Sequence, residues 1–135
     1  MSSSGLDIEV LGIDMLVPDA PTALEVRELC VLALASAGID EGHMAVEFVD
    51  AERIQLLNRE YRNIDSPTDV LAFGVDEDGD SAGPRELGDI VICPEHTTDL
   101  REAVVHGTLH LTGMDHEVDD GEMLALQAEL MRWIR

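Results

Sequence analysis

Lysine is missing from this 135-residue sequence, and its eight basic residues, all arginine, face 29 acidic residues. The formal net charge is therefore -21 at pH 7. Such a field opposes non-specific attraction to nucleic acids and to anionic membranes, because both depend on cationic contacts. A polyanionic substrate would have to be met by a local cation. Two origins of the acidity stay open: adaptation to a high-salt interior, or drift in a GC-rich genome.

Cysteines and long apolar segments are also scarce. Cys30 and Cys93 have neither the number nor the spacing of a disulfide framework or a cysteine-based zinc site, so we expect reduced, partly buried thiols. The longest apolar run, residues 29–35, is far below the ~20 residues of a membrane span. Residues 1–5 lack the basic start and apolar core of a signal peptide, and we interpret them as a disordered leader. We therefore expect a soluble cytoplasmic protein with no membrane partner.

The remaining residues, 6–135, have the length of a single domain. Alternating or short apolar runs predict four strands, over residues 6–10, 43–49, 70–73 and 87–92. Apolar residues at three- and four-residue spacings predict helices over about 22–37, 51–61 and 95–111, and a last helix that includes 123–134. Asp50 and Asp119 are suited to cap the second and the last of these helices.

Three features of the chain are interpreted as incidental to function. Residues 74–86 are acidic, but the positions where a calcium-binding EF-hand needs Gly and Glu hold Ser81 and Leu87, so we predict a solvated loop. His43 stands alone at the start of a predicted strand and is interpreted as a surface residue. His96 lies ten residues before the nearest other histidine, which places it outside any shared metal geometry.

Three of the five histidines fall within eleven residues, His-Gly-Thr-Leu-His-Leu-Thr-Gly-Met-Asp-His. On a helix, His106 and His110 would project from one face about one turn apart. Gly113 can take a positive φ, end the helix and turn the chain back, so that His116 completes a triangle. Three neutral imidazoles leave the fourth position of a tetrahedral zinc open, as in catalytic sites. The spacing predicts one catalytic Zn²⁺ per chain.

The same spacing matches the metzincin protease pattern His-Glu-x-x-His-x-x-Gly-x-x-His except at its second position, where this chain has Gly107. Zinc proteases use that Glu as the general base. Its absence removes a proton shuttle that typically raises the reaction rate by on the order of 100- to 10,000-fold. The site is therefore predicted to be hydrolytic but not proteolytic.

Phosphodiester hydrolysis makes a different demand, a cation beside the metal. Arg62 is our candidate, because the planar guanidinium can hold two phosphate oxygens at once. A simpler interpretation stays open, in which Arg62 only complements the dipole at a helix C-terminus. Asp115 and Asp89 are candidates to orient the imidazoles, or else are ordinary surface carboxylates.

Three blocks of the sequence resemble the YbeY-type endoribonucleases, also described as rRNA maturation factors. Residues 57–62, Leu-Asn-Arg-Glu-Tyr-Arg, run into 65–73, Asp-Ser-Pro-Thr-Asp-Val-Leu-Ala-Phe, and are similar to that family's Leu-Asn-x-x-Tyr/Phe-Arg and Asp-x-Pro-Thr-Asp/Asn-Val-Leu-Ser-Phe. The other blocks are residues 87–94, Leu-Gly-Asp-Ile-Val-Ile-Cys-Pro, and the histidine block at 106–116. The three blocks occur in the family's order and span about half of the chain.

The resemblance implies an α/β (α+β) fold, with a small mixed four-stranded sheet covered by about four to five helices and a metal cleft beside the His-x-x-x-His helix. It implies zinc held by His106, His110 and His116, with Arg62 as the functional arginine. It further implies cleavage of single-stranded RNA, maturation of the small-subunit (16S) rRNA 3′ end, and ribosome quality control. The implied partners are ribosomal RNA, small-subunit proteins and an assembly GTPase.

The sequence departs from the family's pattern in two places. Ala72-Phe73-Gly74 stands where many relatives have Ser-Phe-Pro, and only eleven residues separate Pro94 from His106, about half the expected number. Because the acidic surface disfavours direct RNA binding, we expect ribosomal proteins or high salt to guide docking. The alternatives are a non-catalytic ribosome assembly factor with a structural metal and, less favoured because of Gly107, a metalloprotease-like hydrolase.

Overall fold

The computed structural model describes residues 5–16, 20–75 and 85–134. The predicted leader falls mainly on residues 1–4, and the predicted acidic loop mainly on 76–84, so both lie outside the described residues. Gly5 already belongs to the first strand, one residue before its predicted start.

A mixed four-stranded sheet in the order β1-β2-β4-β3 forms the centre of the molecule. Its strands are β1 (Gly5–Leu11), β2 (Glu41–Phe48), β3 (Val70–Gly74) and β4 (Glu86–Ile92). β1, β2 and β4 are parallel, whereas β3 pairs antiparallel to β4 and forms an edge. The four strands and the mixed sheet are as predicted.

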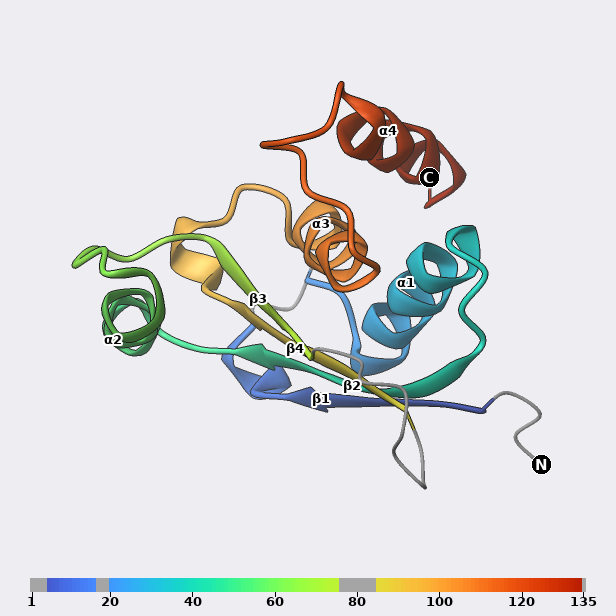
Figure 1. The fold of residues 1–135 in the computed structure, drawn as a ribbon. Coiled ribbons are helices and arrows are strands. Elements are labelled where there is room, and N and C mark those ends of the chain that lie inside the picture. Colours follow the sequence, from blue (N-terminus) through green and yellow to red (C-terminus); the bar gives the residue numbers. More distant parts are fainter. Residues whose placement is uncertain (1–4, 17–19, 76–84, 135) are drawn as a thin grey trace.

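Helices cover both faces of this sheet (Figure 1). The helices α1 (Ala23–Ser36), α3 (Leu100–Leu111) and α4 (Glu122–Ile134) lie on one side, and α2 (Ala51–Arg62) lies on the other, near β3 and β4. Two 3₁₀ turns, η1 (Ile13–Met15) and η2 (Pro94–His96), complete the described elements. None of the helices in the described parts of the chain is both long and apolar enough to cross a bilayer.

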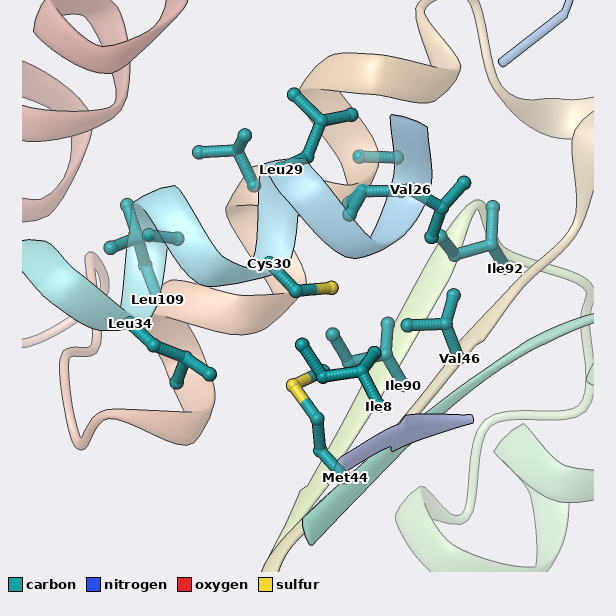
Figure 2. Close-up of a cluster of buried hydrophobic side chains, with 14 of the residues drawn as sticks. Ile8, Val26, Leu29, Cys30, Leu34, Met44, Val46, Ile90, Ile92 and Leu109 are labelled. Atoms are coloured by element: carbon teal, nitrogen blue, oxygen red, sulfur yellow. The ribbon is translucent and has the colours of Figure 1, made fainter. Parts of the chain in front are cut away.

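The main core fills the space between α1, α3 and the sheet. Figure 2 shows Cys30 of α1 with its sulfur directed toward side chains of the strands, among them Ile8, Met44 and Ile90. Both cysteines are free and buried, as predicted. Burial raises the pKa of the Cys30 thiol to about 12 and leaves it in the unreactive protonated form. Cys30 is therefore a packing residue.

A second, smaller core lies under α2, where Ile54 and Leu57 pack against Leu71 and Val91. Asp50 begins α2 as predicted, since its Oδ1 accepts a hydrogen bond from the Arg53 N–H at 2.8 Å. α2 thereby has a fixed start, and its last residues reach the edge strand β3.

The prediction of one helix over residues 95–111 is wrong at its start. Pro94 opens the short turn η2, and α3 begins only at Leu100, where the Asp99 carboxylate caps the Glu102 N–H at 3.1 Å. The Thr97 hydroxyl donates to the Cys93 carbonyl at 2.7 Å, which holds this connection in a non-helical form. A local side-chain cap thus overrides the apolar periodicity.

α3 lies unusually close to β4 at Gly107. A Cβ added there would approach Ile90 Cγ2 to 2.7 Å, and Ile90 is fully buried. Position 107 therefore faces the sheet, with room for no side chain.

We expect Gly107→Ala to lower the free energy of unfolding by about 1–2 kcal/mol, because overpacking outweighs the gain in helix propensity. Urea unfolding at equilibrium measures this change. Gly74→Ala is the matched control, since among the described residues no atom lies within 4 Å of its added Cβ. A Gly107→Ala protein as stable as the wild type would contradict this account of the contact.

His43 connects three strands on the face of the sheet that carries α2. Its Nδ1 lies 3.2 Å from Glu86 Oε1 of β4, and its Nε2 lies 3.4 Å from Glu9 Oε1 of β1. The hydrogen bond with Glu86 is the main cause that raises the pKa of His43. The residue is thus a surface histidine engaged in ion pairs, in keeping with its predicted incidental role.

The raised pKa predicts a pH-dependent contribution of His43 to stability. Because the folded-state pKa exceeds the unfolded value of about 6.5, the contribution is complete below that pH and is lost as pH rises through the folded pKa. The stability difference between wild type and His43→Gln should be larger at about pH 5.5 than at about pH 8.5 in urea unfolding. An equal difference at both values would refute the ion-pair assignment.

Candidate metal centre

Three imidazoles converge beside the C-terminal end of α3. The ring centroids are 4.9 Å apart for His106 and His110, 5.0 Å for His106 and His116, and 5.3 Å for His110 and His116. One nitrogen of each ring lies within 4.8 Å of the others, and all three residues are half-buried. Three neutral nitrogen donors so close together can hold one metal ion.

The local sequence explains how the triangle is closed. His106 and His110 lie one turn apart on α3, which ends at Leu111. Gly113 has φ +103°, the conformation predicted for it, and its N–H donates to the His110 carbonyl at 3.0 Å. The chain therefore reverses directly after the helix and brings His116 back to the other two rings.

Two of the rings have a fixed partner on Nδ1. Gln127 Oε1 lies 2.7 Å from His106 Nδ1, and the Met114 carbonyl lies 3.0 Å from His110 Nδ1. A backbone carbonyl can only accept, so Nδ1 of His110 carries the ring proton and its Nε2 keeps a lone pair. The same holds for His106 when the amide oxygen of Gln127 is its partner. The donor set therefore fits a metal ion, which needs an unprotonated imidazole nitrogen.

The electrostatics of His110 agree with this role. Burial is the main cause that lowers its pKa, and the neighbouring His106 lowers it further. His110 is accordingly neutral at physiological pH, the form in which imidazole binds metals.

The imidazoles form one wall of a cleft of about 810 Å³. Residues from the end of α2, the following loop, β3 and the turn after α3 complete its lining, among them Arg62, Asp69 and Asp115. Arg62 is the last residue of α2, after which Asn63 takes a left-handed conformation with φ 60° and redirects the chain. Folding thus brings Arg62 into the same cleft as histidines more than 40 residues later in the sequence.

Arg62 is available for an anion. No carboxylate within the described parts of the chain lies within ion-pair distance of it, whereas Arg101 and Arg132 are paired with Glu25 and Glu129. Of the described residues that line the cleft, Arg62 is the one arginine. It therefore supplies the local cation that the acidic composition requires.

The two carboxylates proposed to orient the imidazoles differ in position. Asp115 lines the cleft, where its Oδ1 accepts the Glu117 N–H at 2.9 Å and stabilises the turn that contains His116. Asp89 does not line it, because its neighbour Ile90 faces α3 and successive strand residues point to opposite faces. Asp89 lines a different hollow instead, and its role in orienting a ligand gains no support from this position.

Two positions near the histidines also have defined surroundings. Gly107 faces Ile90 and not the cleft, so packing against the sheet excludes the Glu of the protease pattern. His96 lies on η2 and lines an adjoining hollow of about 310 Å³, which shares His106 with the cleft. The group of described residues that could hold a metal ion does not include His96.

Gln127 is the residue of this centre that the sequence interpretation missed. It lies four residues after Met123 and three before Leu130, both buried, so it occupies the inward stripe of α4. A polar residue in an apolar stripe was the available signal. This pattern could not identify the partner of Gln127, because only the packing of α4 over α3 brings Gln127 to His106.

Known proteins with similar sequences indicate the family of the chain. The family model described as endoribonuclease YbeY matches residues 17–135. A relative from Rubrobacter xylanophilus named endoribonuclease YbeY is 42% identical over 94% of this chain and 92% of its own length. One of the same name from Macrococcus caseolyticus is 38% identical over 84% of this chain and 86% of its own.

The fold also has a solved counterpart. The solution structure of TM1509 from Thermotoga maritima has a TM-score of 0.58 and 29% sequence identity, and the match covers 94% of this chain and 88% of that one. Sequence and fold thus agree over nearly the whole length. The chain belongs to the endoribonuclease YbeY family.

Proposed function

We propose that this protein is a zinc-dependent endoribonuclease that cleaves single-stranded RNA. One observation carries the proposal: Arg62 lines the same cleft as the three histidines that can hold a metal ion. The name shared by its relatives supports RNA as the substrate.

Zinc is the metal that three neutral imidazoles favour, although copper or nickel can bind such a site more tightly in vitro. His106, His110 and His116 would hold the ion. When bound, it supplies Lewis acidity toward a phosphodiester.

Arg62 has the second role in the reaction. Its guanidinium can donate two parallel hydrogen bonds to the phosphate oxygens, which orients the scissile group and stabilises the charge that develops on it. The other charged residues of the cleft, Asp69, Asp115 and Glu117, repel phosphate. Of the described charged side chains of the cleft, Arg62 is therefore the one that attracts the phosphates of an RNA backbone.

The wider role follows the family resemblance. We propose that the substrate is small-subunit rRNA near its 3′ end, and that the protein acts in the cytoplasm in ribosome maturation and quality control. A net charge of -21 supports docking through ribosomal proteins or an assembly GTPase, because the protein has few cations for RNA. The packing of Gly107 argues against a protease, since the general base of zinc proteases has no room there.

Loss of Arg62 should slow RNA cleavage without loss of the metal. We expect Arg62→Ala to reduce kcat by about 100- to 1,000-fold, the effect of removing one positioned charge from the transition state. Single-turnover cleavage of a ribosomal RNA fragment measures the rate, and elemental analysis measures the metal content.

Arg59→Ala is the matched control for this variant. Arg59 lies one turn earlier on α2 and lines a different hollow, so its loss should leave the rate unchanged. Full cleavage by Arg62→Ala would show that Arg62 has no part in the reaction.

Removal of the metal should abolish cleavage and lower the Tm. A ligand that binds only the folded state adds to its stability by mass action, so the chelator-treated protein should unfold at a lower temperature. Zinc should restore both properties in the wild type but not in His110→Ala. Calorimetry measures the Tm, and analysis of the RNA products measures cleavage. Undiminished cleavage by the metal-free protein would overturn the zinc assignment.

A further inference from the structure

The last helix contributes to the metal centre although it carries no ligand. Resting on the metal role proposed above, we propose that Gln127 of α4 is a positioning residue that fixes the tautomer and orientation of His106. Its side-chain oxygen accepts the Nδ1 proton, and the ring therefore presents an unprotonated Nε2 to the ion.

The geometry of the contact carries this assignment. The distance from Gln127 Oε1 to His106 Nδ1 is 2.7 Å, at the short end of the range for such hydrogen bonds. A neutral imidazole has one ring proton, and an amide oxygen can only accept. If the amide were reversed, its nitrogen would donate to Nδ1, the ring proton would move to Nε2, and no metal could bind there.

The backbone of α4 holds Gln127 firmly in place. Met123, one turn before it, and Met131, one turn after it, are both buried in the main core. The start of α4 is fixed by Asp119, whose carboxylate accepts hydrogen bonds from Gly121 at 2.8 Å and Met123 at 2.9 Å. This is the capping role predicted for Asp119, and the burial of Met123 and Met131 turns the face of α4 that carries Gln127 inward.

Gln127 has a special status among the partners of the three rings. The partner of His110 is the backbone carbonyl of Met114, which no substitution removes. His116 has no hydrogen-bonded partner among the residues that the structure describes. Within that part of the chain, Gln127 is therefore the side chain through which the orientation of a ligand can be altered.

The residue type indicates that position 127 serves the ligand more than the core. An apolar side chain would suit the inward stripe of α4 better, since a half-buried amide gains little from packing. A residue type that packs poorly at its position is typical of functional sites. Gln127→Met should thus keep or raise the stability of the metal-free protein while it weakens metal binding.

Metal affinity gives the first test, with Co²⁺ and Zn²⁺ titrated into the full-length protein against a chromophoric chelator. We expect Gln127→Met to raise the Kd by about 10- to 100-fold, the usual effect of removing a ligand's hydrogen-bond partner. Gln127→Glu keeps an acceptor and should bind at least as tightly as the wild type. Gln55→Met, the matched control on α2, removes a surface hydrogen bond to Asp65 and should leave the Kd unchanged.

The tautomer gives a second test that needs neither metal nor RNA. Long-range proton–nitrogen correlation spectra of the metal-free protein should show His106 protonated on Nδ1 in the wild type and in Gln127→Glu. The same ring in Gln127→Met should shift toward the Nε2-protonated form, which neutral histidine adopts readily without an acceptor.

The outcomes separate this inference from the proposed function. Unchanged Kd and an unchanged tautomer in Gln127→Met would overturn the positioning role, as would an Nε2-protonated His106 in the wild type. A raised Kd together with a lowered stability of the metal-free Gln127→Met protein would also overturn it, since a purely structural role of Gln127 predicts both changes. Failure of the wild type to cleave RNA would count against the endoribonuclease and leave the tautomer result intact.

Discussion

The close approach of α3 to β4 is the constraint on which the rest of the site depends. Gly107 lies directly on Ile90, so the helix cannot rotate or lift from the sheet without opening a buried contact. That contact fixes the direction of His106 and His110, which lie on a neighbouring face of the same helix. The position that carries a catalytic Glu in zinc proteases is thereby committed to the core. Packing and chemistry thus assign neighbouring residues of one helix to different tasks.

A strongly acidic protein with an anionic substrate needs its cations at specific places. The net charge of -21 gives no general attraction for RNA, and Arg101 and Arg132 are committed to carboxylates. Arg62, the last residue of α2, lines the same cleft as the three histidines. If the acidic residues around Arg62 repel phosphate, a phosphodiester is attracted selectively at Arg62. Partners that bring the RNA to the cleft would complete the recognition.

The candidate metal centre is built from segments that fold under different constraints. The turn at Gly113 needs only a positive φ and forms locally. Gln127 reaches His106 only when α4 is docked through Met123 and Met131, so the affinity for metal and the docking of the last helix are linked. An ion bound by residues of α3 would in turn stabilise a helix that carries none of the ligands.

The sequence by itself determined the four strands, the caps at Asp50 and Asp119 and the group of three histidines that could hold a metal ion, because periodicity, capping and ligand spacing are local properties. Tertiary structure decided the remainder. It placed Arg62 in the cleft, turned Asp89 to the opposite face of the sheet, and brought Gln127 to His106. Such contacts depend on how helices dock on a sheet, and docking is set by the shape and volume of distant side chains, which no local pattern encodes.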